Sequence, residues 1–254
     1  MLVDMHVKTE ASEGVSIKLD DAIKAAKEAN LDGIAICEKL SSAGVKDAIK
    51  KVKKAGLAPF VGVEIHTNSG VLLCFPPKVD AFLTKETWSE LTEFTKPDAK
   101  DVIELVESLG GAVIASRTYD GEITPSMGDD IFEIEGLAAV EVFNSNLSDI
   151  QSDFSIEAAS VLQLKTIGGS DTAKAGAIGK YATLFKEELK SQKDLVDAIK
   201  EGEFWAVQVG RIASRKPAPR ESRGRDDRGR RDGRRDGGKR RDDRGGNNNR
   251  RGRR

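Results

Sequence analysis

Short apolar runs alternate with amphipathic segments through the first 208 residues, and this alternation most constrains the fold. Continuous apolar runs such as residues 33–37 are typical of strands buried on both faces. Residues 21–30 instead place apolar side chains at helical spacing, after acidic residues in the first turn. Strands and helices in alternation predict an α/β fold with a mostly parallel sheet. We expect that sheet to close, or nearly close, into a barrel.

The expected elements follow from these runs and from the turn residues between them. We expect strands at residues 2–7, 33–37, 60–65, 71–75, 112–115, 138–143, 165–168 and 204–207. We expect helices from Ser42 to about residue 54 and at residues 21–30, 98–109, 156–162 and 191–200. The turn at residues 68–70 predicts a hairpin. Residues 78–97 are irregular, and we expect their large apolar side chains to pack over the barrel.

The charges divide the chain into two parts. Residues 211–254 hold 17 Arg and 2 Lys against 7 acidic residues, a net charge of +12. The remaining 22 basic and 35 acidic residues give the rest of the chain a net charge of −13. We therefore predict a folded domain at residues 1–210 and a disordered basic tail at residues 211–254, because the tail has almost no apolar residues with which to offset the entropy of ordering.

The location of the protein is predicted from its cysteines and its apolar runs. Cys37 and Cys74 lie in apolar, strand-like runs, which indicates buried thiols in a reducing compartment. Asp4 and His6 interrupt any apolar N-terminal stretch, so we expect no signal peptide. No apolar run approaches the ~20 residues of a membrane-spanning helix. We expect a cytoplasmic protein without a membrane partner.

Polar side chains gather where the expected strands end. The first strand carries Asp4, His6 and Lys8, which strand alternation places on one face. In a barrel of parallel strands, the chemistry lies at the C-terminal strand ends. The corresponding runs are Asp4-Met5-His6-Val7-Lys8-Thr9, Cys37-Glu38-Lys39, Gly62-Val63-Glu64, Ser116-Arg117, Glu141-Val142-Phe143-Asn144 and Gly169-Ser170-Asp171-Thr172-Ala173.

In this order the runs resemble the motifs of the PHP (polymerase and histidinol phosphatase) family, and the resemblance covers about residues 1–208. It implies a distorted (βα)7 TIM-like barrel of the PHP type. Family members hold up to three divalent metals with His and carboxylate side chains and hydrolyse phosphoesters. The family's site positions fall on Asp4, His6, Lys8, Glu38, Lys39, Glu64, Ser116, Arg117, Asn144, Asp171 and Ala173.

Most of the family's metal ligands are missing from this sequence. Five histidine positions hold Lys8, Lys39, an apolar residue in 71–73, Ser116 and Ala173. The residual metal candidates are His6, Glu64 and Asp171, and His66 is the chain's other histidine. Borderline divalent metals need imidazole and carboxylate ligands together. We therefore expect no metal cofactor; an active enzyme would use Mn, Zn or Fe.

Cations stand at or beside several of the lost histidine positions. Without metals, the carboxylates of Glu38, Glu64 and Asp171 would repel one another. Lys8, Lys39 and Arg117 would neutralise them, which predicts an ion-pair network in place of the metals. Two alternatives remain: neutral drift of a disused site, or a phosphate-binding pocket made by outward-facing cations.

The tail predicts nucleic-acid binding. Arginine at this density, spaced by glycine, suits phosphate contacts on a flexible backbone. The tail has no aromatic residue to stack on bases, so we expect electrostatic binding that is nearly blind to sequence. The alternative is a tail that folds back on the acidic domain. The arginines expected to contact RNA or DNA are Arg223, Arg225, Arg228, Arg230, Arg231, Arg234, Arg235, Arg240, Arg241, Arg244, Arg250, Arg251, Arg253 and Arg254.

Three functions are consistent with these observations. The first, which we favour, is a PHP-like barrel that has lost phosphoesterase activity and carries an RNA-binding tail. The second is an active metal-dependent phosphoesterase with a reduced metal site. The third is a barrel that binds an anionic ligand and is inhibited by its own tail.

Overall fold

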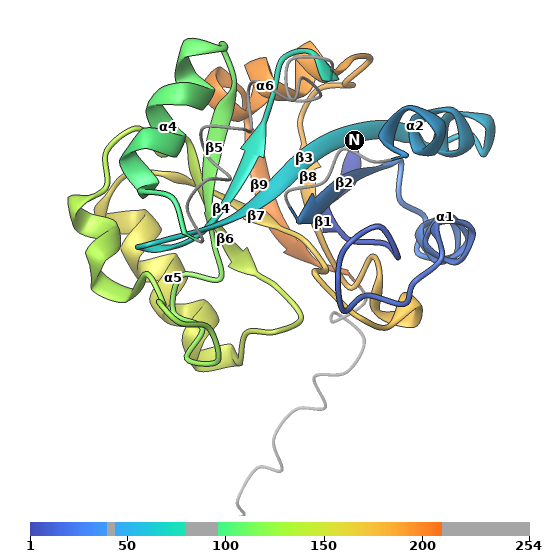
Figure 1. Cartoon of the computed structure of the whole chain (residues 1–254). Helices are drawn as coiled ribbons and strands as arrows, with labels where there is room; N and C mark the ends of the chain where they lie inside the picture. The colour runs from blue at the N-terminus through green and yellow to red at the C-terminus, as the bar shows by residue number, and fades with distance from the viewer. Residues whose placement is uncertain (40–43, 80–95, 210–254) are drawn as a thin grey trace, which may run out of the picture. The chain divides into compact units, whose positions relative to one another are not determined.

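The computed structural model describes residues 1–39, 44–79 and 96–209, which form a nine-stranded, nearly closed α/β barrel (Figure 1). The strands are β1 (Leu2–Val7), β2 (Gly33–Lys39), β3 (Ala58–Thr67), β4 (Gly70–Phe75), β5 (Ala112–Ser116), β6 (Ala139–Phe143), β7 (Lys165–Gly168), β8 (Tyr181–Phe185) and β9 (Phe204–Gln208). The α-helices are α1 (Leu19–Glu28), α2 (Val45–Lys54), α4 (Ala99–Ser108), α5 (Asp149–Val161) and α6 (Gln192–Glu201), with short 3-10 helices at Gly128–Glu133 and Ala175–Ala177.

The strand order is β7-β6-β5-β4-β3-β2-β1-β8-β9, and β9 lies beside β7, which nearly closes the barrel. Four of the eight pairings are parallel: β1–β2, β2–β3, β5–β6 and β6–β7. The other four are antiparallel: β1–β8, β3–β4, β4–β5 and β8–β9. The sheet therefore has more antiparallel pairs than the mostly parallel sheet that we expected.

The expected α/β barrel and the β3–β4 hairpin are confirmed. The sequence analysis missed β8, which pairs with both β1 and β9 and makes nine strands, where the residue pattern predicted eight and the family resemblance implied seven. Helix α5 begins seven residues before its expected start at residue 156. Its start is fixed by Ser148, whose hydroxyl accepts the Gln151 N–H while the Gln151 side chain accepts the Ser148 N–H, a capping box.

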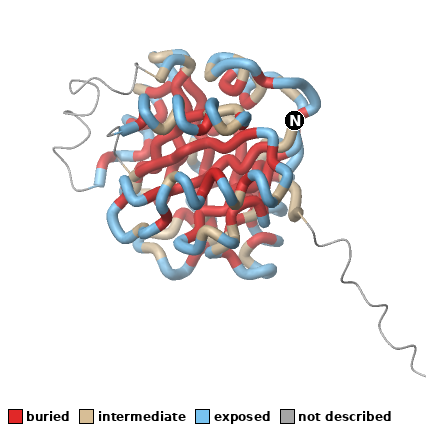
Figure 2. Tube along the Cα trace, turned by 90° about the vertical axis from the view of Figure 1, so that its right-hand side faces the viewer, coloured by how far each residue is buried: buried red, intermediate tan, exposed pale blue. Residues whose placement is uncertain are grey.

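The strands lie between two apolar layers, one inside the barrel and one outside it. Inside the barrel, Val3 and Met5 of β1 pack with Phe60 and Phe75, and α6 covers the N-terminal end of the parallel strands. Outside, α1 packs on β1 and β2, whereas α4 and α5 pack on β3 to β6. Figure 2 shows the buried strands within a rim of exposed helix surface. The C-terminal strand ends are thus left for polar residues.

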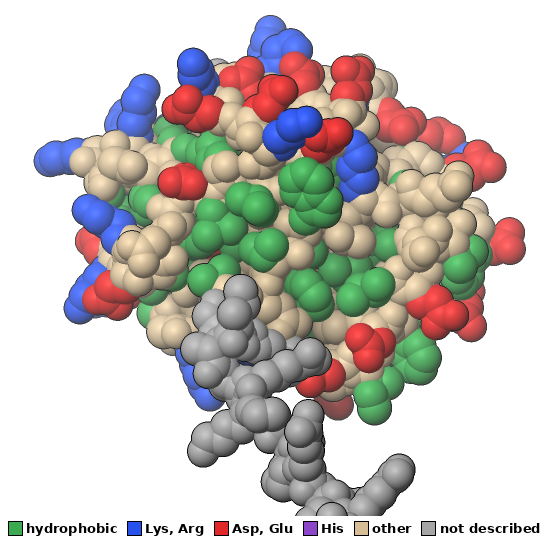
Figure 3. Space-filling model, turned by 180° about the vertical axis from the view of Figure 1, so that it is seen from behind, with side chains coloured by type: hydrophobic (Ala, Val, Ile, Leu, Met, Phe, Trp, Pro, Cys, Tyr) green, Lys and Arg blue, Asp and Glu red, His purple; other side chains and the backbone are tan. Residues whose placement is uncertain are grey.

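Some of the barrel surface is apolar and exposed. Trp205 of β9 is 51% exposed and Leu184 of β8 is 41% exposed. Figure 3 shows hydrophobic side chains gathered on the side of the molecule opposite the view of Figure 1. Among the described residues, no helix is long and apolar enough to cross a membrane.

Two expectations lie outside the described residues. One is the packing of Phe82, Trp88, Leu91 and Phe94 over the barrel, and the other is the disorder of the tail at residues 211–254. Both remain predictions, as does the domain boundary near residue 210.

Candidate functional site

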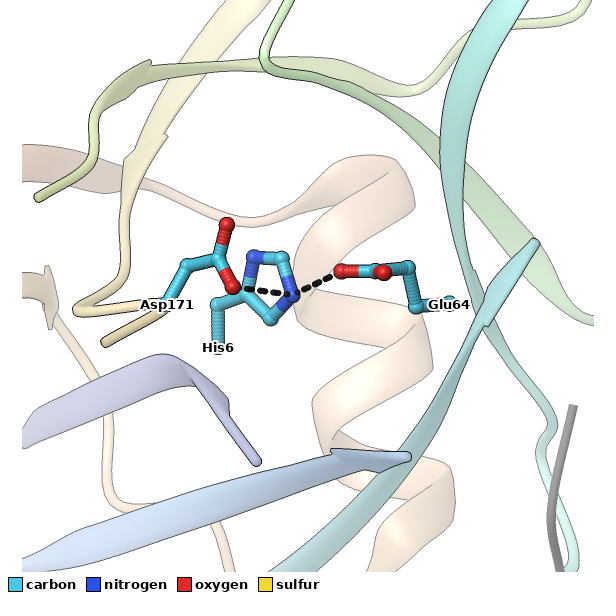
Figure 4. A group of neighbouring side chains, drawn as sticks. All are labelled: His6, Glu64 and Asp171. Atoms are coloured by element: carbon cyan, nitrogen blue, oxygen red, sulfur yellow. Dashed lines mark hydrogen bonds and ion pairs between the residues drawn. The ribbon is translucent and has the colours of Figure 1, made fainter. Parts of the chain in front are cut away.

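His6 lies at the centre of a buried group of charged side chains at the C-terminal strand ends (Figure 4). Its Nε2 lies 2.8 Å from Glu64 Oε2 and 3.7 Å from Asp171 Oδ1, and its Nδ1 lies 3.0 Å from Glu141 Oε1. Burial would lower the pKa of His6, but the charges of Asp171 and Glu141 and the hydrogen bonds to Glu141 and Glu64 raise it to about 10. His6 is therefore an imidazolium that donates from both ring nitrogens at neutral pH.

Lys8 supplies the second buried cation. Its Nζ lies 3.1 Å from Glu64 Oε2 and forms an ion pair with Asp171 Oδ1. Burial opposes the charge, but Asp171 and Glu64 outweigh burial and raise the pKa of Lys8. We call His6, Lys8, Glu64, Glu141 and Asp171 the inner cluster.

The inner cluster in turn keeps Glu64 and Asp171 ionised. Burial would raise the pKa of Glu64, but hydrogen bonds from His6 and from the half-buried His66 hold it well below its usual value. His66 Nε2 lies 2.9 Å from Glu64 Oε1. Burial likewise opposes the charge of Asp171, yet the charges of His6 and Lys8 lower its pKa. The cluster is thus built of ion pairs rather than of neutral groups.

The backbone that carries Asp171 is tightly constrained. Asp171 has φ +36°, in the left-handed region that non-glycine residues rarely adopt. Its N–H donates to the carbonyl of His6 at 2.7 Å. At Gly169, an added Cβ would lie 2.4 Å from the His6 Cβ, so only glycine allows this approach of the chain to β1. These contacts aim the Asp171 carboxylate at His6 and Lys8.

Arg117 lies beside the inner cluster but pairs mainly with another acid. Its guanidinium Nε lies 2.7 Å from Asp120 Oδ2, and Nη2 contacts the same oxygen. Its Nε is 3.8 Å from Asp171 Oδ2. The sequence analysis missed Asp120, which follows Arg117 by only three residues. Arg117 therefore lies at the edge of the cluster, and its charge is largely matched by Asp120.

Strand alternation predicted that Asp4 and His6 lie on the same face of β1, and this prediction is wrong. Asp4 pairs with Ile34 and Val7 pairs with Ile36. Between these two pairs β1 advances by three residues and β2 by only two, so β1 contains a bulge. This bulge turns Asp4 toward the outer layer and His6 toward the interior. Asp4 instead accepts the Ser170 N–H at 2.8 Å and the Gly179 N–H at 3.0 Å. Burial raises the pKa of Asp4 to about 6 despite these hydrogen bonds.

Glu38 is also outside the inner cluster. It pairs in register with Val63, whose side chain lies in the outer layer. Its carboxylate accepts the Thr9 hydroxyl at 2.6 Å, the Thr9 N–H at 3.1 Å and the Ser12 hydroxyl. We call Glu38, Thr9 and Ser12 the Glu38 site. The prediction that Lys39 or another cation neutralises Glu38 is wrong, because these uncharged donors satisfy the carboxylate.

The other positions named from the sequence divide into two groups. The Ser116 hydroxyl donates to Glu141, and the Asn144 amide donates to Glu141 Oε2 at 2.9 Å and to Asp171 Oδ2 at 3.1 Å. Lys39 and Ala173 do not join: within the described ranges, the Lys39 side chain makes no ion pair, and Ala173 is exposed.

The sequence analysis also gave no role to Glu141, Asn146, Thr9 or Ser12. Asn146 donates to the Asp171 carbonyl at 2.7 Å and to its carboxylate at 2.9 Å. A signal existed for Glu141, since it is the one charged residue in the apolar run of β6. Thr9 and Ser12 lie in the loop after β1, where a sequence pattern does not show which carboxylate they reach.

Three metal-ligating side chains do converge, and they are the three that the sequence singled out. His6, Glu64 and Asp171 each offer a ligand atom, and these atoms lie within 4.8 Å of one another. The ammonium group of Lys8 contacts two of these three residues. The arrangement thus combines the spacing of a metal site with a cation supplied by the protein.

Comparison with known families agrees with this fold. The model of the PHP domain matches residues 4–108, and the model of the PHP-associated region matches residues 150–204. The chain therefore contains a PHP domain and a PHP-associated region. A search of curated proteins finds no significant sequence match.

Solved structures share the fold at low sequence identity. PsfC from Pseudomonas syringae is 17% identical with a TM-score of 0.61, covering 82% of this chain and 91% of that chain. A two-domain protein from Bacteroides vulgatus, containing a predicted PHP-like metal-dependent phosphoesterase, is 16% identical with a TM-score of 0.58, covering 82% of this chain and 65% of that chain. A candidate metal-dependent phosphoesterase from Bifidobacterium adolescentis is 18% identical with a TM-score of 0.53, covering 68% of this chain and 88% of that chain.

Proposed function

We propose that this protein is a PHP barrel without metal-dependent phosphoesterase activity, and that its basic tail attaches it to RNA or other nucleic acid. The observation that carries the first half is the position of Lys8. Its ammonium group binds the carboxylates of both Glu64 and Asp171, two of the three residues that could hold a metal. The charge that a divalent ion would bring to these carboxylates is already present.

The state of His6 argues in the same direction. A metal ligand needs a nitrogen lone pair, and an imidazolium with pKa about 10 has none. A metal at His6 would therefore have to displace a proton from the ring. A metal would also have to displace Lys8 from both acids. The residues present therefore do not fit a tightly held divalent ion.

The competing function is a phosphoesterase with a reduced metal site. This second function is favoured by the match to the PHP domain and by two structural neighbours that are described as metal-dependent phosphoesterases. Elemental analysis of protein purified without chelator, with a phosphoesterase screen in added manganese, separates the two. We expect well under one metal per chain and no turnover. Near-stoichiometric Zn, Mn or Fe, with turnover that Asp171→Ala abolishes, would establish the enzyme instead.

A gain-of-binding variant sharpens this test. Lys8→His removes the competing ammonium and restores a histidine where the family has one. We expect it to bind zinc measurably more tightly than the parent chain by isothermal titration, because imidazole is a ligand and ammonium is not. Lys39→His is the matched control, since Lys39 does not touch the acids of the inner cluster. Equal zinc binding by all three proteins would remove the argument from Lys8.

The second half of the proposal rests on charge. The tail holds 19 basic residues, whereas the preceding 210 residues carry a net charge of −13 and repel phosphate. We expect log affinity for single-stranded RNA to fall with log salt at a slope of ~0.7 per phosphate neutralised. Deleting residues 213–254 should remove most of the affinity. Equal affinity with and without the tail, or binding that salt does not weaken, would place the RNA site on the barrel.

A further inference from the structure

Helix α5 lies on the outside of the barrel against β6 and β7, and it carries its large apolar side chains on the side that faces water (Figure 1). Ile150 is 67% exposed, Phe154 is 50% exposed and Val161 is 65% exposed. The residues that α5 buries are all small, namely Ser152, Ser155, Ala158 and Ala159. A surface helix ordinarily has the reverse arrangement, with its large apolar residues toward the core. The outer side of α5 is therefore suited to a contact beyond the barrel.

The spacing of these side chains fits a second helix. Phe154 follows Ile150 by four residues, and Val161 follows Phe154 by seven. These are the spacings of the a and d positions at which two helices pack along a shared seam. Glu157 occupies the remaining position of that pattern, and it is exposed. We call Ile150, Phe154, Glu157 and Val161 the α5 seam.

The surroundings of the α5 seam are acidic. Residues 118–164 contain ten acidic residues and no Lys, Arg or His. Within the described ranges, Glu157 forms no ion pair. Tyr119 packs against Phe154 with 5.6 Å between ring centroids. Burial, the hydrogen bond to Asp129 and the charges of Asp129 and Glu157 raise the pKa of Tyr119 to about 12, in keeping with a negative potential at this face.

This combination of apolar side chains and acids disfavours several partners. A second copy of the α5 seam would bring acid against acid, with no cation in residues 118–164 to offset them. RNA and anionic lipid would be repelled in the same way. The chain's own tail has cations, but Ile212 is its only large apolar residue. Residues 80–95 have large apolar side chains, but one Lys against four acids gives them a net charge of −3.

We propose that the α5 seam docks a basic amphipathic helix of a partner protein, with a lysine or arginine of that helix against Glu157. Such a helix supplies apolar side chains at the matching spacing, and its basic residues complement the acidic surroundings. The charge pair at Glu157 fixes the register of the two helices. The docking depends on neither a metal nor RNA, so it holds or fails independently of the proposed function.

Two synthetic helical peptides test the docking on the full chain. Both have about 20 residues, with Leu at the a and d positions and Lys at most others, and they differ only in carrying Lys or Glu at the central d position. Fluorescence anisotropy of the labelled peptides is measured in about 0.3 M salt, which screens attraction between net charges. We expect the Lys peptide to bind at least ~3-fold more tightly than the Glu peptide. No binding of the Lys peptide up to about 100 µM would overturn the proposal.

Matched variants locate the contact. Phe154→Ser should weaken binding of the Lys peptide at least ~10-fold, because a large apolar side chain leaves the seam. Leu184→Ser is its control, since Leu184 is 41% exposed on β8, outside the α5 seam. Glu157→Lys should reverse the preference between the two peptides. Glu187→Lys makes the same change of charge at an exposed position outside the seam and should leave the preference as it is.

Melting curves verify that each variant is folded. Peptide binding that Phe154→Ser leaves unchanged, or a preference that Glu157→Lys does not reverse, would refute docking on the α5 seam. Sedimentation equilibrium and RNA titration of the parent chain and of Phe154→Ser check the other occupants. Self-association or RNA binding that Phe154→Ser abolishes would assign the face to a second copy or to nucleic acid and would equally overturn the proposal.

Discussion

Two buried acidic sites of this barrel, the inner cluster and the Glu38 site, are satisfied by different chemistry. In the inner cluster, Glu64 and Asp171 face the ammonium of Lys8 and the imidazolium of His6. At the Glu38 site, a carboxylate that is 2% exposed accepts hydroxyl and backbone N–H groups and, among the described residues, no cation. Both sites occupy positions where the family resemblance implies metal ligands.

The difference shows two ways in which a barrel can keep buried carboxylates without metals. A single carboxylate close to a loop can be solvated by the neutral donors of that loop. Three carboxylates that converge cannot, because their mutual repulsion requires opposing charge. The inner cluster therefore depends on cations, whereas the Glu38 site depends on geometry. Each prediction below tests one side of this contrast.

The largest effect is expected at Lys8. Lys8→Met removes the ammonium and leaves Glu64 and Asp171 buried beside each other. Breaking a buried ion pair in this way costs ~3–5 kcal/mol of unfolding free energy. Urea denaturation at pH 7 measures the loss.

Lys39→Met is the matched control for Lys8→Met. It removes the same group from the neighbouring strand, where no ion pair is broken among the described residues, and should change stability by less than ~0.5 kcal/mol. A Lys8→Met protein as stable as the parent would mean that the inner cluster does not need its lysine.

The second effect concerns pH and His6. The pKa of His6 is about 10 in the folded chain and ~6.5 when unfolded, so the folded state holds a proton that the unfolded state releases. Its stabilisation is complete below pH ~6.5 and is lost as pH rises toward 10. Between pH 7 and 8.5, the unfolding free energy should fall by up to ~1.4 kcal/mol per pH unit.

The other histidine provides the control for this pH dependence. His6→Gln should abolish the fall, whereas His66→Gln should keep it, because His66 is half-buried at the rim and does not bridge two acids. Urea titrations across this pH range measure both variants. The assignment to His6 fails if stability is flat between pH 7 and 8.5 or if His66→Gln removes the slope.

A smaller effect than that of Lys8→Met is expected at the Glu38 site. Ser12→Ala removes one hydroxyl donor but leaves the hydroxyl and N–H of Thr9 on Glu38, so the loss should be about 1.5–3 kcal/mol, as for a hydrogen bond to a charged group. Because no cation among the described residues pairs with Glu38, the loss should be the same in low and high salt. A loss as large as that of Lys8→Met would erase the contrast between the two sites.

The sequence predicted much of this fold because apolar periodicity reports burial directly. The runs at 33–37 and 71–75 lie within β2 and β4, and residues 68–70 do turn the chain between β3 and β4. The strand β8 was not predicted because the polar Thr183 interrupts its apolar run. In the structure the Thr183 hydroxyl hydrogen-bonds the backbone of Gly168. A sequence pattern does not show such a long-range partner.

The candidate site was predictable in its members but not in its partners. His6, Glu64 and Asp171 were identified by motif, and the structure brings them together. The separation of Asp4 and Glu38 from them depends on the bulge in β1 and on the register of β2 with β3. A one-residue shift changes the face of every following side chain. Register is set by the whole sheet, so local sequence could not show it.

The position of β1 between β2 and β8 has a consequence for the order of folding. The Met1 ammonium bonds the carbonyl of Phe185, 184 residues away, so one edge of the first strand stays unpaired until β8 is available. Closing so long a loop is entropically costly and slow. During synthesis on the ribosome, we expect the first strand to wait with an open edge, the feature most prone to pairing with other chains. His6 and Lys8 can form their ion pairs with Asp171 only late in synthesis, because Asp171 lies just before β8 in the chain.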